Sequence, residues 1–393
     1  MIPMNQYFLV VAILLLLSVL ASKVSSRMGI PSLVVFIVIG MLAGTEGVGG
    51  IQFDSPVIVQ SLGVIALIFI LFSAGFDTHS AFARPVLWQG LGLATFGVII
   101  TAFLVAIFAY YIIPMPFIHS LLLGAIVSST DASAVFSVLR SKQVAMNPHL
   151  KTLIEFESGS NDPMSIFLTL ACIELILTQN LSGFDLLLMF FLQLVVGLLV
   201  GFSMGKFIPY IFNKLKLEYS GLYPVLNVAL LLLTYGISSS LDGSGFLAIY
   251  LTGLMMAKAN FNHKTNLYRF HDGFAWLMQI IMFLILGLQI FPSQLPSVFL
   301  VGILVAAFLM IIARPVAVYS VLSLSVLSFR EKTMVAWTGL RGAVPIILAT
   351  FPLIAQIPQA NIIFNIVFFI VLTSVLIQGT LLTRVARLLK VNQ

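Results

Sequence analysis

The sequence predicts an all-α polytopic membrane protein, and two observations carry that prediction. Of its 393 residues, 60% are hydrophobic and 8% are charged, against roughly a quarter charged in soluble domains. The mean hydropathy is +1.14, and the apolar segments are long enough for spanning helices rather than barrel strands. Residues 1–393 are predicted to form a single transmembrane domain, because no soluble domain, linker or low-complexity stretch interrupts the pattern.

Thirteen apolar segments are predicted to span the membrane as helices. They lie at about 7–24, 30–44, 57–74, 87–112, 117–138, 151–178, 184–210, 222–239, 244–258, 273–290, 297–325, 333–353 and 361–388. The first segment resembles the apolar part of a signal peptide, but its positive charges, Lys23 and Arg27, follow it. That order predicts a first spanning helix that is retained in the mature protein.

Lysine and arginine are confined to alternate connections between these segments. Of the nineteen, seventeen lie in odd-numbered connections or at the C-terminal end, and none lies in an even-numbered connection. The positive-inside rule therefore predicts a multi-pass protein of the cell (inner) membrane, with its N-terminus outside and its C-terminus cytoplasmic. The same sorting explains the pI of 9.4 without nucleic acid as a partner. The other two, Arg314 and Arg341, lie inside predicted segments.

The order of the segments predicts two inverted six-helix repeats joined by a connecting seventh helix. In that arrangement the fifth segment, 117–138, corresponds to the twelfth, 333–353. Both are interrupted by polar or helix-breaking residues, at 128–131 and 338–345. Interrupted helices at matching positions of inverted repeats are the best sequence pointer to the midplane site of a transporter.

Asp162 is the strongest candidate for a site residue. It lies eleven residues after Lys151, the last basic residue before its segment. At about 1.5 Å per helical residue, that is roughly 16 Å, or half of a ~30 Å hydrocarbon core. Ionisable groups at such depth mark ion or proton pathways, and the adjacent Pro163 frees a backbone carbonyl.

Oxygen ligands accompany this carboxylate. Asn161 adds an amide, and Ser158 and Thr130 add hydroxyls, a set that hard monovalent cations favour over nitrogen or sulfur ligands. The sequence therefore predicts a monovalent cation site formed by Asp162, Thr130 and Ser158. The alternative is a buried aspartic acid that stays protonated and only hydrogen-bonds its neighbours.

Asp131 ends the polar run Ser128-Ser129-Thr130-Asp131 and lies about 21 Å into its segment by helical rise. Four successive polar residues cannot share one helix face, so some must turn toward a protein-lined or wet cavity. A Ser/Thr packing seam between helices is the alternative. It would account for residues 128–130 and leave Asp131 unexplained.

Glu157 and Arg341 are predicted to form a structural ion pair within the membrane. Arg341 lies nine residues after Lys332, roughly 14 Å deep, and an arginine at a helix centre costs about 2.5–3.5 kcal/mol on insertion scales. Arg314 is predicted to provide charge compensation, either for Asp131 or for the negative ends of broken half-helices. Snorkelling to the inner surface is the alternative for Arg314.

Three motifs resemble those of the monovalent cation/proton antiporters of the sodium–proton exchanger superfamily. They are STDASAVFSVL at 129–139, ESGSNDP at 157–163 and GLRGAVP at 339–345, with ARPVAV at 313–318. The resemblance covers essentially the whole chain, with the motifs in the family's order. Its nearest branch is the bacterial cell-volume-regulation type of potassium/proton antiporter.

The resemblance implies a homodimer in which a transport core moves against a dimerisation scaffold. Scaffold helices would lie at about 1–84 and 222–290, core helices at about 87–178 and 297–388, and a linker helix at about 184–210. The fifth and twelfth helices would be unwound where they cross. Asp162 would bind cation and proton alternately, aided by the oxygen ligands named above and by Asp131.

Two departures from the family pattern bear on this expectation. Sodium/proton members often carry a glutamate in a Leu-Phe-Glu-Gly-Gly pattern of the third helix, where this chain has Ser73. That serine, a candidate ligand, favours potassium over sodium. Relatives of the potassium type often continue into a cytosolic regulatory domain, whereas this sequence stops at Gln393. We therefore expect either that the domain is lacking or that the protein is longer.

The predicted function is secondary active exchange of a monovalent cation for H⁺, electroneutral at one to one, in pH homeostasis and cell-volume regulation. Potassium is favoured, with sodium (or lithium)/proton antiport of the same fold as the alternative. Remote alternatives are a passive channel, although the chain has no TVGYG-like filter, and an intramembrane aspartyl protease built on Asp131 and Asp162. No cofactor is expected, and the single cysteine, Cys172, permits neither a disulfide framework nor a thiolate metal site.

Overall fold

The computed structural model describes residues 4–28, 32–53, 55–78, 80–142, 144, 146–178 and 182–391. These residues form helices joined by turns and loops, and an isolated β-bridge links Gly44 and Ile51. The helices are α1 (Met4–Met28), α2 (Ser32–Ala43), α3 (Pro56–Asp77), α4 (Ser80–Gly92), α5 (Val98–Ile112), α6 (Phe117–Ile126), α7 (Ala132–Ser141), α8 (Pro148–Leu177), α9 (Gly183–Lys214), α10 (Leu222–Ser240), α11 (Gly245–Lys258), α12 (Lys264–Leu288), α13 (Leu295–Phe308), α14 (Arg314–Val321), α15 (Phe329–Trp337), α16 (Ala343–Ile354), α17 (Ala360–Thr373) and α18 (Gly379–Leu388). The expectation about a cytosolic regulatory domain concerned the end of the sequence at Gln393, which lies outside the described residues.

The all-helical membrane fold class is confirmed. Within the described residues, eight helices are long and apolar enough to cross a membrane, and five more apolar helices are 10–17 residues long. The count of thirteen spanning helices stays a prediction. Most helix ends lie within a few residues of the predicted ones.

Helix α12 shows the largest difference from the predicted boundaries. It was predicted from residue 273 and begins at Lys264 instead. The added stretch, KTNLYRFHD, is polar, so a search for apolar segments omits it. It nevertheless continues the helix because it contains no proline or glycine, and His263, with a left-handed backbone (φ 64°), precedes its first residue.

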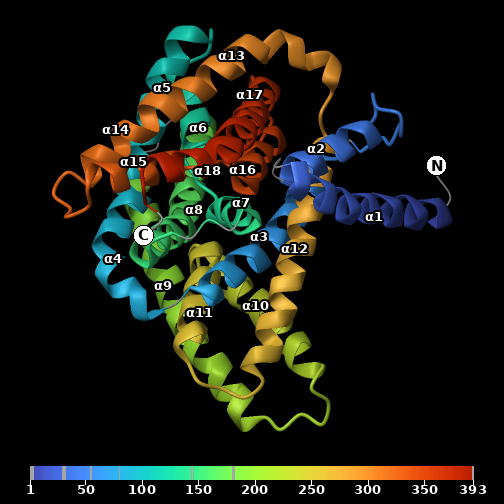
Figure 1. Ribbon diagram of the computed structural model, residues 1–393, viewed down its shortest axis with the longest axis vertical. Helices are drawn as coiled ribbons and strands as arrows, with labels where there is room; N and C mark the ends of the chain where they lie inside the picture. Colours follow the sequence, from blue (N-terminus) through green and yellow to red (C-terminus); the bar gives the residue numbers. More distant parts are fainter. Residues whose placement is uncertain are drawn as a thin grey trace.

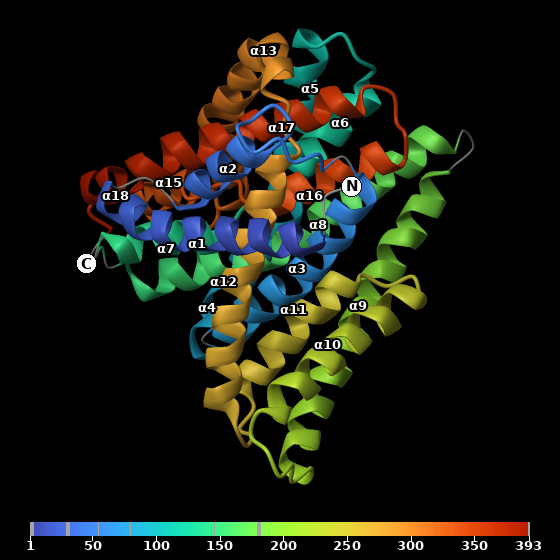
Figure 2. The ribbon, with the colours of Figure 1, turned by 90° about the vertical axis from the view of Figure 1, so that its right-hand side faces the viewer.

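The helices pack in two groups (Figures 1 and 2). In the first group, α11 packs along α3 and α9, and α12 packs along α2 and α3. In the second, α8 packs against α4 and α6, and α13 packs against α17. Figure 1 shows α9–α11 below and the orange and red helices α13–α18 above. The groups meet where α16 contacts α3 and where α8 contacts α11. Their assignment to scaffold and core stays a prediction.

Glycines allow very close helix crossings in the first group. A Cβ on Gly40 of α2 would lie 2.2 Å from the carbonyl oxygen of Leu284, and one on Gly287 of α12 would lie 2.2 Å from that of Ile37. Small residues at such crossings let helix backbones approach and gain packing contacts in a lipid environment. The α2–α12 crossing therefore depends on having no side chain at these two positions.

Both predicted interruptions are present. Helix α6 ends at Ile126 and α7 begins at Ala132, while α15 ends at Trp337 and α16 begins at Ala343. Three π-helical turns interrupt other segments: η1 (Leu93–Gly97) lies between α4 and α5, η3 (Leu309–Ala313) between α13 and α14, and η4 (Ser374–Gln378) between α17 and α18. The turns η1 and η3 fall in the fourth and eleventh predicted segments, which the inverted repeat places in corresponding positions.

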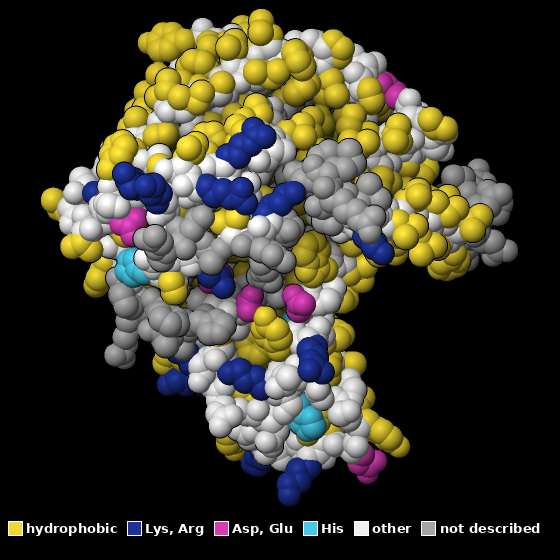
Figure 3. Space-filling model, in the orientation of Figure 1, with side chains coloured by type: hydrophobic (Ala, Val, Ile, Leu, Met, Phe, Trp, Pro, Cys, Tyr) yellow, Lys and Arg dark blue, Asp and Glu magenta, His cyan; other side chains and the backbone are white. Residues whose placement is uncertain are grey.

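Charged side chains are unevenly spread over the surface. Figure 3 shows lysine and arginine gathered across one face, with acidic side chains between them, while apolar side chains cover the upper part of the same view. An apolar surface of this kind suits contact with lipid acyl chains. The orientation of this face relative to the cytoplasm stays a prediction.

Candidate cation site at the crossing of two interrupted helices

The two interruptions cross and are joined by hydrogen bonds. The amide of Asp131 donates to the carbonyl of Leu340 (2.8 Å). The guanidinium Nη1 of Arg341 donates to the carbonyls of Ser128 (3.0 Å) and Ser129 (2.7 Å). Carbonyls at the end of a helix lack helical partners and carry the negative end of its dipole. Arg341 therefore satisfies, from across the crossing, two carbonyls of the break that follows α6.

Helix α8 presents polar side chains to the first interruption. The Ser129 hydroxyl donates to Asp162 Oδ1. Asn161 Nδ2 donates to Thr130 Oγ1 (2.6 Å), and Asn161 Oδ1 accepts from the Thr130 amide (3.4 Å). Thr130 Oγ1 also lies 3.0 Å from Ser158 Oγ. The structure thus brings together four residues that the sequence singled out: Asp162, Asn161, Thr130 and Ser158.

Two further serines, Ser128 and Ser165, bind the end of α6. Ser128 Oγ lies 2.6 Å from the carbonyl oxygen of Ala125 and 3.2 Å from Ser165 Oγ. The Ser165 hydroxyl donates to the same carbonyl (2.6 Å). The hydroxyl of Ser128 therefore has partners on both α6 and α8.

Asp131 lies on the other side of the interruption and caps the helix that follows. Its Oδ1 accepts from the amide of Ala134 (3.1 Å), the arrangement by which aspartate satisfies an unpaired N–H at a helix start. Gly342 packs directly against it, because a Cβ at that position would lie 1.9 Å from Asp131 Oδ2. The crossing can close this tightly only because residue 342 has no side chain.

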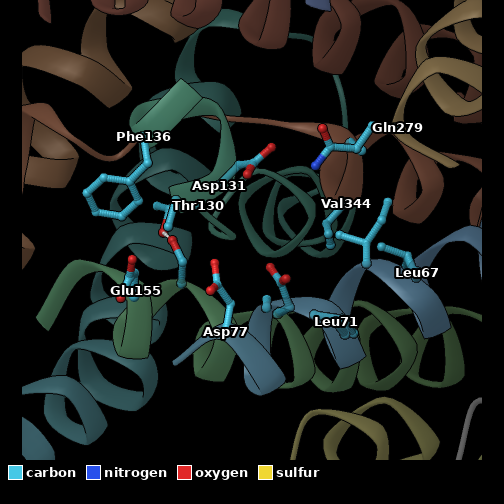
Figure 4. Close-up of a pocket in the computed structure, with 16 residues that line it drawn as sticks. Leu67, Leu71, Asp77, Thr130, Asp131, Phe136, Glu155, Gln279 and Val344 are labelled. Atoms are coloured by element: carbon cyan, nitrogen blue, oxygen red, sulfur yellow. Dashed lines mark hydrogen bonds between the residues drawn. The ribbon is translucent and has the colours of Figure 1, made fainter. Parts of the chain in front are cut away.

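A cavity of about 120 Å³ opens beside the crossing and reaches Asp162. Four carboxylates line it, those of Asp77, Asp131, Glu155 and Asp162, and no lysine or arginine does so among the described residues. Figure 4 shows Thr130 and Gln279 on opposite sides of this space. Asp162 is 6% exposed. The cavity therefore offers a cation an acidic path to a nearly buried carboxylate.

Ser73 does not share this position. The described residues of α3 that line the cavity are Leu67, Ile70, Leu71, Ala74 and Asp77, and Ser73 is not among them. Asp77, one helical turn after Ser73 and on nearly the same face of α3, does line it. The role of Ser73 as a cation ligand therefore stays a prediction.

The predicted Glu157–Arg341 ion pair is wrong, because Glu157 pairs with Arg314. Glu157 Oε1 lies 2.6 Å from Arg314 Nη1, and the two side chains are 1% and 4% exposed. Arg314 follows the π-helical turn η3 and faces α8, whereas Arg341 lies in the interruption, where its nearest acceptors are main-chain carbonyls. Arg314 also donates to the carbonyl of Val335 (3.3 Å) in the last turn of α15. Its role in charge compensation stays a prediction.

Sequence reasoning missed Ser374 and Gln378 altogether. Both belong to η4 and both are fully buried. The Ser374 hydroxyl accepts from the amide of Arg341 (3.0 Å). One signal was present, because Ser374 and Gln378 lie four residues apart, and so on one helix face, within a segment predicted to span the membrane. Ser129 was noted in the polar run at 128–131, but the structure reveals its contact with Asp162.

Comparison with known proteins agrees with this architecture. The sodium/hydrogen exchanger transmembrane family matches residues 11–388. The K(+)/H(+) antiporter NhaP of Alkalimonas amylolytica is 41% identical over 390 residues, covering 99% of this chain and 67% of that protein. The K(+)/H(+) antiporter NhaP2 of Shewanella sp. (strain MR-4) is 42% identical over 391 residues, covering 99% and 68%. The chain thus spans about two thirds of the length of these relatives.

A solved structure shows the same fold. The sodium proton antiporter MjNhaP1 of Methanocaldococcus jannaschii at pH 8 superimposes with a TM-score of 0.85 at 24% identity, covering 97% of this chain and 98% of that one. The family match covers nearly every residue, and the family's motifs meet at the crossing described above. The chain therefore belongs to the sodium/hydrogen exchanger family of membrane transporters.

Proposed function

We propose that the protein is a secondary active antiporter that exchanges a monovalent cation, K⁺ in preference to Na⁺, for H⁺ by alternating access. The observation that carries this proposal is Asp162. Its carboxylate is nearly buried at the crossing, receives a hydrogen bond from Ser129, and lines an acidic cavity. A carboxylate so placed can hold either a proton or a cation. The family consists of transporters rather than enzymes, and the scheme needs no cofactor.

In this scheme Asp162 supplies the charge and its neighbours supply neutral oxygen ligands. Thr130 and Ser158 line the same cavity as the carboxylate, and their hydroxyl oxygens lie 3.0 Å apart, so we propose that both help to bind the cation. Asn161 holds Thr130 in place through both ends of its amide. A bound cation would be coordinated by the hydroxyl oxygens of Thr130 and Ser158 in place of the hydrogen bond between them. That hydrogen bond would form again when a proton replaces the cation at Asp162.

The proposed stoichiometry is one proton per cation. Asn161 is uncharged, so Asp162 is neutral both with a proton and with a monovalent cation bound. The empty, ionised site is the state that is costly to carry across the membrane interior, and this cost enforces coupling. Asp131 is assumed to keep one charge state because it caps α7.

Potassium is favoured because the relatives at 41% and 42% identity are named as K(+)/H(+) antiporters. The second candidate is Na⁺ or Li⁺ exchange. It is supported by the shared fold with a sodium proton antiporter.

The deciding experiment is dye-monitored exchange in proteoliposomes across Li⁺, Na⁺, K⁺ and Rb⁺. We expect coupled proton movement with K⁺ as the preferred ion. A preference for Na⁺ or Li⁺ would overturn the K⁺ assignment and leave antiport intact. Ion flux without coupled protons would indicate a channel. Cleavage of a peptide substrate without any flux would indicate a protease.

We further propose that the protein acts as a homodimer in the cell (inner) membrane, with a cytoplasmic C-terminus. The confinement of basic residues to alternate connections supports this orientation. A role in pH homeostasis and cell-volume regulation would follow from potassium exchange. Reporter fusions at the two termini would test the orientation.

A further inference from the structure

The π-helical turn η4 bridges both sides of the second interruption. Ser374 Oγ accepts from the amide of Arg341 (3.0 Å) and donates to Gln378 Oε1 (2.6 Å), while Gln378 Nε2 donates to the carbonyl of Trp337 (3.3 Å). Trp337 is the last residue of α15, and Arg341 stands two residues before α16. Both η4 side chains are 0% exposed. Two residues four apart thus satisfy one unpaired backbone group on each side of the break.

This bridge matters because the Arg341 side chain has few other anchors. Nη1 binds the carbonyls of Ser128 and Ser129. Its Nε and Nη2 have no hydrogen-bond partner among the described residues, although both are buried. The guanidinium is therefore not held by a two-pronged carboxylate contact of the kind that usually orients a buried arginine. Its position depends on where the backbone of residue 341 is fixed, and Ser374 holds that backbone.

The contacts continue from Arg341 to the cation site. Arg341 binds the carbonyl of Ser129, and the hydroxyl of the same residue donates to Asp162. A continuous series of hydrogen bonds thus runs from Gln378 through Ser374, Arg341 and Ser129 to the Asp162 carboxylate. Under the predicted inverted repeat, α17 and α18 correspond to α8. Ser374 and Gln378 of η4 then bind the interruption at 338–345 through neutral groups. Asn161 and Asp162 of α8 bind the interruption at 128–131 in the corresponding way.

We infer that Ser374 and Gln378 are positioning residues for cation binding. They hold the backbone at residue 341 so that Arg341 keeps Ser129 against Asp162. The inference rests on the proposed function of Asp162 as the cation carrier. Neither residue is among the described residues that line the cavity beside Asp162. Their effect on cation binding is therefore transmitted through Arg341.

Ser374→Ala tests this in proteoliposomes. Removing a neutral buried hydrogen bond changes an equilibrium by about two- to tenfold, so we expect the apparent KM for K⁺ to rise by about that factor. Gln378→Ala should raise it similarly, and the double variant should cost no more than the worse single one, because both act through one series of contacts. Ser374→Thr keeps the hydroxyl and should restore the KM.

The control is Thr380→Val. The Thr380 hydroxyl is exposed on the same helix and donates to the carbonyls of Leu376 (2.5 Å) and Ile377 (3.3 Å), so its loss should leave the KM unchanged. A merely structural role for η4 would lower the folded yield and Vmax and leave the KM as in the wild type, and that result would overturn the inference. If Ser374→Ala does not fold, Gln378→Ala decides in its place, by the same KM criterion. Absence of coupled exchange in the wild type would instead reject the proposed function.

Discussion

The buried Glu157–Arg314 pair makes the sharpest stability prediction. Its atoms lie 2.6 Å apart with both side chains almost fully buried. Removing one partner of such a pair typically costs about 3–5 kcal/mol, because the other charge stays buried and unpaired. Glu157→Leu should be the worse single change, because it removes the carboxylate that pairs with Arg314 while two buried cations, Arg314 and Arg341, remain.

The double variant Glu157→Leu/Arg314→Met should recover most of that loss. Replacing a buried ion pair by apolar residues of similar volume is often neutral. The remaining cost is the hydrogen bond from Arg314 to the Val335 carbonyl, about 1 kcal/mol. We therefore expect the double variant to unfold within about 1 kcal/mol of the wild type, a strongly non-additive result.

The assay is reversible unfolding of the purified protein in detergent, or its thermal midpoint where unfolding is irreversible. Glu157→Leu/Arg341→Met serves as the comparison and should not recover, because Arg341 binds main-chain carbonyls that would lose their donor. If the Arg341 combination recovers and the Arg314 combination does not, the pairing described here is refuted.

Three further outcomes are expected. Asp162→Asn should abolish coupled exchange in proteoliposomes while the protein still folds, because an amide can neither balance a cation nor accept its proton; substantial exchange would remove Asp162 from the carrier role. Gly342→Ala should destabilise the protein and impair exchange, since its Cβ would lie 1.9 Å from Asp131 Oδ2, whereas Gly273→Ala, with nothing within 4 Å, should be neutral or stabilising in the same melts. Imposing a membrane potential should leave the rate of exchange unchanged, and the test should use Na⁺ or Li⁺ if either is carried, because valinomycin would dissipate a K⁺ gradient. A clear rate increase with an inside-negative potential would mean two protons per cation.

A pH-dependent contact lies outside the membrane-spanning helices. Two hydrogen bonds from Ser293 lower the pKa of Glu46 below its ordinary value of 4.5. A lowered folded-state pKa contributes stability above the ordinary value, and that contribution is lost as the pH falls through the folded value. The stability difference between wild type and Glu46→Gln should therefore be fully present at neutral pH, begin to decline near pH 4.5, and vanish only below the lowered folded-state pKa. A difference that persists in acid would exclude ionisation as its cause.

The helices and both interruptions could be predicted because the bilayer imposes simple requirements. A spanning helix needs about twenty apolar residues, and backbone freed at membrane depth must find partners. Those requirements locate the breaks at 128–131 and 338–345, and they mark Asp162 by depth alone. The start of α12 could not be predicted from these requirements, because its residues are polar and a search for long apolar segments does not include them.

Side-chain partners inside the bundle could not be predicted in the same way. Two arginines, Arg314 and Arg341, lie inside predicted segments, and charge alone does not show which of them pairs with Glu157. The choice depends on how η3 rotates Arg314 and on the carbonyls that the other interruption offers to Arg341. Ser374 and Gln378 escaped notice for a related reason, since a polar residue within an apolar helix shows no partner until the helix rotation is known.

The hydrogen bond between Asp131 and Leu340 limits how this molecule can change shape. If residues 128–131 rewound into a continuous helix, the Asp131 amide would turn back to the carbonyl four residues earlier and leave Leu340. Arg341 would at the same time lose the carbonyls that it now binds. Neither helix can close its gap alone without leaving several buried polar groups unsatisfied, at about 1–3 kcal/mol each. We therefore expect the crossed pair to travel as a rigid unit, with any hinge lying in the connections outside it.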